Sequence, residues 1–216
     1  MLAENLEEVG LEVEIPSPRR RYCDVGGGQR VAAITWGESS PSVALLHGGA
    51  QNAHTWDTVA MALGLPAVAI DLPGHGRSDW RSDADYGVRT MALNVAEALR
   101  HLAPKASMVV GIGLGAPVAL LAADVLGPKI DRIVMVDSLA GVRLPGDERP
   151  PSQAATNVAA FTAHERFGSF EAMLATTMEH NPGRTERSLR RGLRARISKC
   201  VHRLEVLRGS VDQSAQ

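Results

Sequence analysis

The sequence has few of the features that direct a chain to a membrane, a secretory route or a nucleic acid. The net charge of its 216 residues is −1, so no overall charge favours nucleic acid or an anionic membrane. No apolar run approaches the ~18 residues of a membrane span, and the acidic residues 1–8 lack the basic and apolar regions of a signal peptide. The two cysteines, Cys23 and Cys200, lie far apart without metal-ligand spacing. These absences predict a cytoplasmic protein with free thiols and without metal, nucleic-acid or membrane partners.

The composition and the spacing of apolar residues predict one globular α/β domain. Hydrophobic residues make up 44% of the chain and charged residues 22%, as in ordinary globular proteins. Two short strands at residues 21–25 and 30–36 flank a glycine turn, which predicts a hairpin. Apolar strands then alternate with helices: strands at 42–46, 67–71, 107–110 and 130–137, and helices at 55–63, 88–102 and 117–126. This alternation predicts a doubly wound, mostly parallel sheet with its site beyond the carboxyl ends of the strands.

Changes in composition divide the chain into four parts. Residues 1–20 are expected to form a flexible leader, and residues 21–144 the α/β core. Helices expected at 152–164 and 169–180 make residues 145–183 a helical lid. Residues 184–216 are a basic tail, with eight arginines and one lysine against two glutamates up to residue 208. Its apolar residues recur at helical spacing, which predicts a solvated cationic helix with a disordered end; they are Leu189, Leu193, Ile197 and Val201.

The segment after the strand at 107–110 carries the main functional signal. It reads Gly111-Ile112-Gly113-Leu114-Gly115 and leads directly into the helix at 117–126. The pattern G-x-S-x-G places a nucleophilic serine at the tip of a strained strand-to-helix turn. Gly113 holds that tip position here, and glycine tolerates strained backbone but has no side chain to attack a substrate. We therefore expect a nucleophile elbow without its nucleophile.

Four further motifs follow along the chain: His47-Gly48-Gly49, similar to an oxyanion motif; His54 and Trp56, similar to H-x-W; residues 71–78, similar to D-x-P-G-H-G-x-S; and residues 134–137, similar to V-x-V-D. In this order, they resemble the α/β-hydrolase fold family over about residues 30–183. The resemblance implies that the amides of Gly49 and Leu114 form an oxyanion hole. It also implies a set of pocket-shaping residues: His47, Gly48, Trp56, Asp71 and His75. The implied activity is hydrolysis of a small ester or related acyl compound, without a cofactor.

Departures from the family pattern predict impaired catalysis. Gly113 replaces the serine, and none of the downstream histidines is identified as the triad base; His164, His180 and His202 lie in expected helices with polar neighbours. Asp137 is a candidate for the triad acid. The two further strands that the family places after the lid are missing, so the fold is expected to be C-terminally incomplete. One alternative is a non-catalytic protein that binds a small molecule, and another is a remnant without specific activity.

The same glycines also fit a different pattern. Gly111-x-Gly113-x-x-Ala116 matches the dinucleotide fingerprint G-x-G-x-x-[GA]. That fingerprint usually opens the first strand–helix unit of its domain, whereas this segment follows two such units that carry hydrolase motifs. The hydrolase interpretation is therefore preferred, and a dinucleotide site stays the other possibility.

The strand at 130–137 raises a separate expectation. Its residues 133–136 are apolar, prone to form strands and uncharged. Without covering strands, such an edge is expected to pair with a second copy of the chain unless the basic tail covers it.

Overall fold

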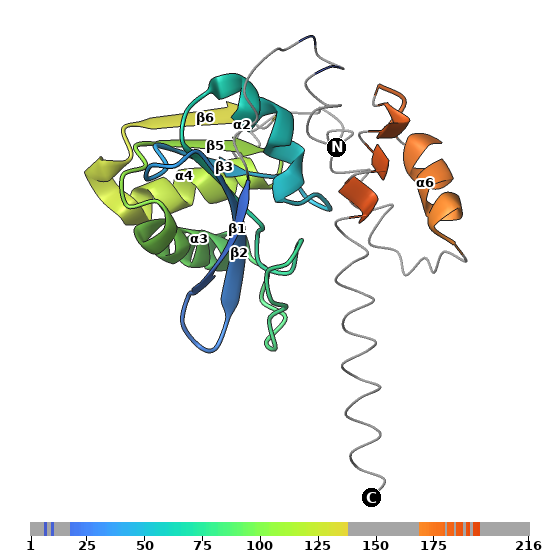
Figure 1. The fold of residues 1–216 in the computed structure, drawn as a ribbon. Coiled ribbons are helices and arrows are strands. Elements are labelled where there is room, and N and C mark those ends of the chain that lie inside the picture. Colours follow the sequence, from blue (N-terminus) through green and yellow to red (C-terminus); the bar gives the residue numbers. More distant parts are fainter. Residues whose placement is uncertain are drawn as a thin grey trace, which may run out of the picture.

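The strands form one six-stranded sheet in a computed structural model that describes residues 7, 10, 18–137, 169–179, 181–183, 185–187, 189–190 and 192–194. They are β1 (Arg19–Asp24), β2 (Arg30–Trp36), β3 (Val43–Leu46), β4 (Ala67–Ile70), β5 (Met108–Ile112) and β6 (Arg132–Val136). Their order across the sheet is β1-β2-β4-β3-β5-β6 (Figure 1). β3, β4, β5 and β6 run parallel, while β2 is antiparallel to β4 and to β1. The predicted mostly parallel sheet is therefore confirmed.

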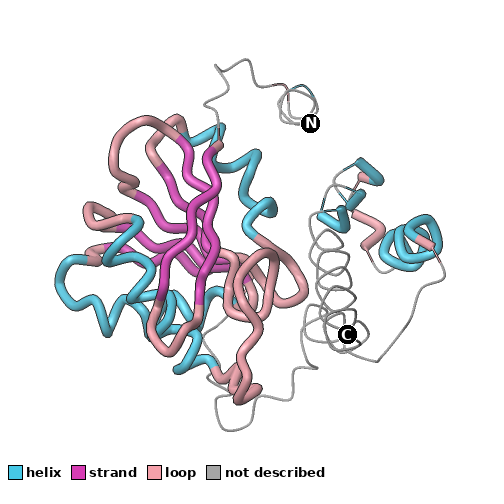
Figure 2. The backbone as a smooth tube through the Cα atoms, turned by 60° about the horizontal axis from the view of Figure 1, so that its bottom comes forward, coloured by secondary structure: helices cyan, strands magenta, loops and turns pink. Residues whose placement is uncertain are grey.

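Helices cover both faces of this sheet (Figure 2). They are η1 (Ala53–Trp56), α2 (Asp57–Leu63), α3 (Val88–Leu102), α4 (Gly115–Leu126) and η2 (Gly127–Lys129), with α6 (Phe170–Glu179) further along the chain. α3 and α4 pack on one face and α2 on the other, as a doubly wound sheet requires. No helix within the described residues is long and apolar enough to cross a membrane.

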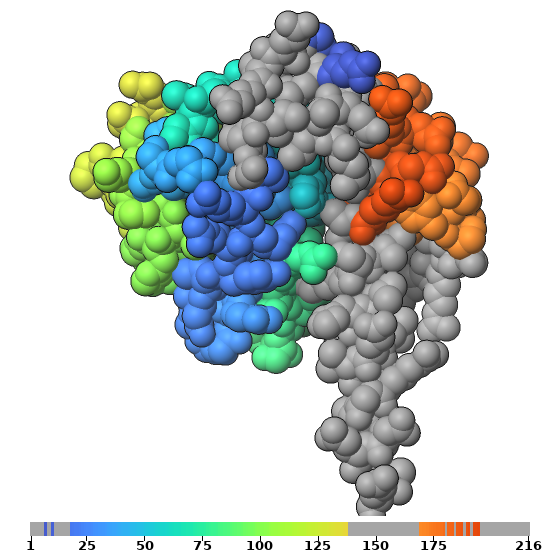
Figure 3. Space-filling view, in the orientation of Figure 1, coloured from blue at the N-terminus to red at the C-terminus, as the bar shows by residue number. Residues whose placement is uncertain are grey.

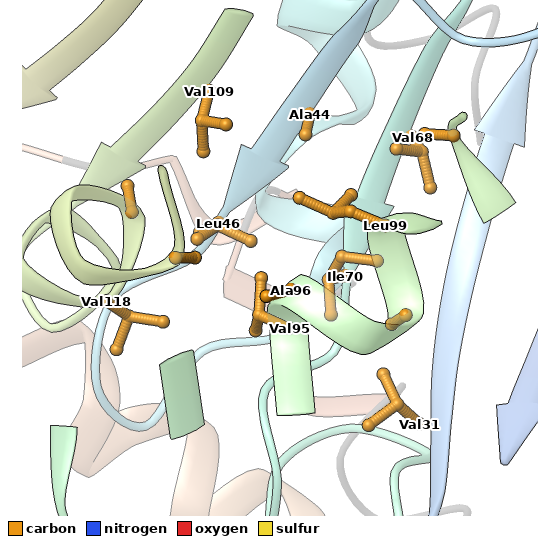
Figure 4. Packing of buried hydrophobic residues seen from close by; sticks show 14 of the residues in the cluster. Val31, Ala44, Leu46, Val68, Ile70, Val95, Ala96, Leu99, Val109 and Val118 are labelled. Atoms are coloured by element: carbon orange, nitrogen blue, oxygen red, sulfur yellow. The ribbon is translucent and has the colours of Figure 1, made fainter. Parts of the chain in front are cut away.

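The central strands are apolar throughout because both of their faces are covered. All residues of β3 and β4 are buried. Neighbouring side chains of a strand point to opposite faces, so Leu46 and Ile70 join the cluster under α3 and α4, while Leu45 joins the cluster under α2. Figure 4 shows Leu46 and Ile70 packed near Val95 and Leu99. This double coverage fixes where the strands end, and so where their carboxyl-end loops meet.

The sheet starts earlier than the sequence predicts. β1 begins at Arg19, which pairs with Thr35 of β2, so residues 19 and 20 belong to the sheet and not to a flexible leader. Of its six side chains only Cys23, a free thiol, is buried, and this polar sequence hides the strand from an analysis of apolar periodicity. Cys200 lies outside the described residues.

A separate, smaller apolar cluster joins α6 to the tail. Leu174 of α6 packs against Leu189 and Leu193, with Phe170 and Met173 at the edge of the cluster. The packing crosses residue 183, where the expected lid ends, so the described residues from 169 to 194 form one helical unit. The expected helix at 152–164 and the later part of the tail lie outside the described residues.

β6 forms an edge of the described sheet. Ile133, Val134 and Val136 are 37%, 43% and 39% exposed, although they are apolar. The helical unit lies on the opposite side of the molecule from β6, as the orange and yellow surfaces in Figure 3 show. The described part of the tail is therefore not placed to cover this edge.

Candidate functional site

The elbow glycines differ in the space around them. β5 passes into α4 through Gly113 and Leu114 alone. Gly113 has a φ of +52°, and a Cβ added there would meet, among the described residues, only the Gly48 Cα, at 3.7 Å. A Cβ at Gly111 would overlap with the carbonyl group of Gly115, and one at Gly115 would overlap with the main chain at the end of β3. The flanking glycines thus allow close packing of strand and helix, while the tip leaves room for a side chain that this chain does not supply.

His47 ties the loop after β3 to the loop after β4. The ring is fully buried, and its Nε2 accepts a hydrogen bond from the Leu72 amide at 3.0 Å. The proton therefore resides on Nδ1, which donates to the Gly48 carbonyl oxygen at 2.7 Å. Burial, followed by the charge of His75 with its ring centroid 5.1 Å away, lowers the pKa of His47 to about 4. His47 is thus a neutral structural link at physiological pH, not a general base.

In the loop after β3, the amides of Gly48 and Gly49 differ in whether a described residue accepts from them. The Gly48 amide donates to Gln51 Oε1 at 2.9 Å, and Ala50 adopts a left-handed φ of +59° that strains a non-glycine residue. Within the described part of the chain, neither the Gly49 amide nor the Leu114 amide donates a hydrogen bond. Leu114 is the N-cap of α4, where the helix dipole favours negative charge. Both amides therefore lack an acceptor within the ranges that the structure describes.

The Asp71 carboxylate links the loop after β3 to the loop after β4. Its carboxylate is 1% exposed and accepts hydrogen bonds from the Ala53 amide at 2.7 Å and the Arg77 amide at 2.9 Å. Arg20 of β1 completes the set through an ion pair of 3.1 Å. A Cβ at Gly76 would overlap with this carboxylate, so the glycine lets the loop close around it. Arg20 was not among the predicted site residues, because its partner lies 51 positions away in the sequence.

The H-x-W pair lies in the supporting structure. His54 Nε2 lies 3.0 Å from Arg20 Nη2, and because a guanidinium only donates, Nε2 is the acceptor. Its Nδ1 therefore donates to the buried Asp57 carboxylate at 3.1 Å. Trp56 is 6% exposed and packs in the cluster between α2 and the sheet. Both residues anchor η1 and, with it, the end of the loop that carries Gly49.

Of the candidates for the remaining catalytic groups, Asp137 lies within the described residues. Asp137 follows β6 with a φ of +51° and is exposed, and the Gly113 amide donates to the neighbouring Val136 carbonyl oxygen at 3.2 Å. This hydrogen bond brings Asp137 next to the elbow, and none of the described residues is a partner that orients its carboxylate. His164, His180 and His202 lie outside the described residues. In the described ranges, no group of three or more His, Cys, Asp or Glu residues is arranged to hold a metal ion.

Comparison with known proteins places this arrangement among hydrolases. A family model for the alpha/beta hydrolase family matches residues 43–208. The chain is 42% identical over 193 residues to the esterase Rv0045c of Mycobacterium tuberculosis, covering 89% of this chain and 63% of that protein. It is 32% identical over 116 residues to protein phosphatase methylesterase 1 of Bos taurus, covering 50% of this chain and 30% of that protein.

A solved structure of the same mycobacterial esterase has a TM-score of 0.73 to this chain at 39% identity, covering 90% of this chain and 65% of that one. The chain therefore spans less than two thirds of the length of these relatives.

Proposed function

The chain belongs to the alpha/beta hydrolase family, and on that basis we propose that its elbow region binds small esters or related acyl compounds but hydrolyses them poorly. Gly113 carries this proposal, because the backbone conformation of the elbow is present while the side chain that would attack the substrate is not. The names of the relatives, an esterase and a methylesterase, support the ester class.

Binding is expected to use main-chain groups. A carbonyl oxygen that accepts hydrogen bonds from the Gly49 and Leu114 amides would sit at the N-terminus of α4, with its acyl carbon beside Gly113. Such donors stabilise the charge that develops on the oxygen when any nucleophile, water included, attacks the carbon. Loss of a triad member typically lowers the rate by ~10⁴-fold, and the residual rate comes from these donors and from binding. No cofactor is needed for this chemistry.

Turnover of p-nitrophenyl acetate tests the catalytic part of the proposal. The purified protein should hydrolyse little of it above a heat-treated control, and Gly113→Ser alone should not restore an efficient rate, because none of the downstream histidines is expected to accept the hydroxyl proton. Gly113→Ala is the matched control, since it adds the same backbone strain without a hydroxyl. Efficient turnover that disappears on changing His164, His180 or His202 would contradict the proposal and identify a base.

Thermal unfolding with a panel of small esters and lactones tests the binding part. A ligand at 100 times its Kd stabilises the native state by about 2.7 kcal/mol, which is a measurable rise in Tm. No shift with any compound would favour a remnant without specific activity. Quenching of tryptophan fluorescence by NAD(H) in place of an ester effect would favour the dinucleotide alternative.

A further inference from the structure

The helical unit is held together by its own contacts. Its apolar cluster is separate from the two clusters of the sheet. Arg190 pairs with Glu171 of α6 at 2.9 Å and with Glu186 at 2.8 Å, and its guanidinium lies 5.5 Å from the centroid of the Phe170 ring. These contacts link α6 to the segment after it.

One side chain of the α/β core reaches this unit. Asn52 is 5% exposed, and its Nδ2 donates to the Gly192 carbonyl oxygen at 3.2 Å, 140 positions along the chain. Among the described residues, this is the hydrogen bond that joins residues 169–194 to residues 18–137. The hydrogen bond satisfies this buried donor in the docked arrangement, and a neutral hydrogen bond makes a modest net contribution to that arrangement.

The same side chain also organises the loop after β3. Asn52 is the N-cap of η1, and its Oδ1 accepts a hydrogen bond from the His54 amide at 3.0 Å. On one side of it, Gln51 holds the Gly48 amide through its side chain; on the other, Ala53 donates to Asp71. Asn52 therefore lies in the middle of the chain segment whose conformation places the Gly49 amide.

We propose that Asn52 is a positioning residue that couples docking of the helical unit to the conformation of residues 47–53. When the unit is docked, the Asn52 amide group is fixed at both ends, and the loop that carries Gly49 is held in the arrangement described above. When the unit moves away, Oδ1 still caps η1 but Nδ2 loses its acceptor, and the loop gains freedom. The role of Gly49 in this coupling rests on the proposed function. The hydrogen bond from Asn52 to Gly192, which we call the latch, does not.

Two substitutions separate the latch from the cap. Asn52→Asp and Asn52→Ser both keep an oxygen that can cap η1, because aspartate and serine are good N-cap residues, and both remove the amide donor. Asn94→Asp on α3 is the matched control for the added charge, because the Asn94 oxygen, which accepts from Arg81 at 3.1 Å, is retained. If either Asn52 variant does not fold, the other still tests the proposal.

The experiment measures trypsin cleavage at Arg187, Arg190 and Arg194 together with hydrogen exchange of residues 47–53. Loss of one neutral hydrogen bond should raise the fraction of molecules in which the helical unit is undocked and open to the protease. The cleavage rate should therefore rise roughly 2- to 10-fold in the Asn52 variants but not in Asn94→Asp. Exchange of the Gln51 amide, which donates to the Gly48 carbonyl oxygen at 3.3 Å, should accelerate with it.

Unchanged cleavage in both Asn52 variants would overturn the latch, and faster cleavage with unchanged loop exchange would overturn the coupling. Neither readout needs a ligand or turnover, so a failure of the proposed ester function would leave this result interpretable.

Discussion

Acid should destabilise this protein through His47. In the folded chain burial lowers the pKa of this ring to about 4, whereas the unfolded chain has the ordinary value of 6.5. As the pH falls below 6.5, the unfolded state binds a proton that the folded state excludes, so the contribution of His47 to stability is complete above 6.5 and is lost progressively toward pH 4. At 1.36 kcal/mol per pKa unit, this linkage is worth about 3 kcal/mol.

Urea denaturation of the wild type and His47→Gln at several pH values between 7 and 4 measures this linkage. Glutamine offers a donor and an acceptor but does not titrate, so the variant should lose about 3 kcal/mol less stability over this range than the wild type does. His101→Gln is the control, because this histidine lies on the surface of α3 with 60% of its side chain exposed. Parallel stability curves for the wild type and His47→Gln would show that the folded state accepts the proton at little cost, and would refute the buried neutral assignment.

Three other predictions address the supporting structure. Asp71→Ala should lower the free energy of unfolding by about 3 kcal/mol, because a buried ion pair and two amide hydrogen bonds lose their acceptor; a loss under about 1 kcal/mol by urea denaturation would contradict this. Gly111→Ala should lower the Tm sharply because its Cβ would overlap with main-chain atoms, while Gly64→Ala, with open space around it, should cost only about 1–2 kcal/mol. Equal Tm values for the two would refute the packing argument. Val134→Lys should reduce any self-association through the β6 edge, and light scattering that shows the same species in both proteins would argue against that edge.

Local signals predicted most of the sheet. The strands β3 and β4 are short apolar runs bounded by polar or glycine residues, and burial on both faces leaves such runs few alternatives. The tip of the elbow was placed at Gly113 by its spacing from the strand, and its positive φ agrees with that position.

Long-range contacts account for what the sequence could not predict. Arg20 lies in a polar edge strand, and nothing near it in the sequence indicates that its guanidinium would pair with buried Asp71. The contact between Asn52 and Gly192 likewise depends on how a distant segment folds back, although the N-cap role of Asn52 has a local signal, an asparagine just before a short helix. Partners of this kind are decided by tertiary packing, which one sequence does not reveal.

The unequal space around the elbow glycines also constrains how a gene for this fold can change. Substitutions at positions 111 and 115 place a Cβ against main-chain atoms, so they should be removed by selection for folding, whatever the activity. A Cβ added at position 113 would make only an ordinary contact with the described residues, 3.7 Å from the Gly48 Cα, and glycine and serine codons can differ by a single base. A lineage can therefore lose or regain a hydroxyl at this tip in one mutational step, at the cost of some backbone strain but without passing through an unfolded protein.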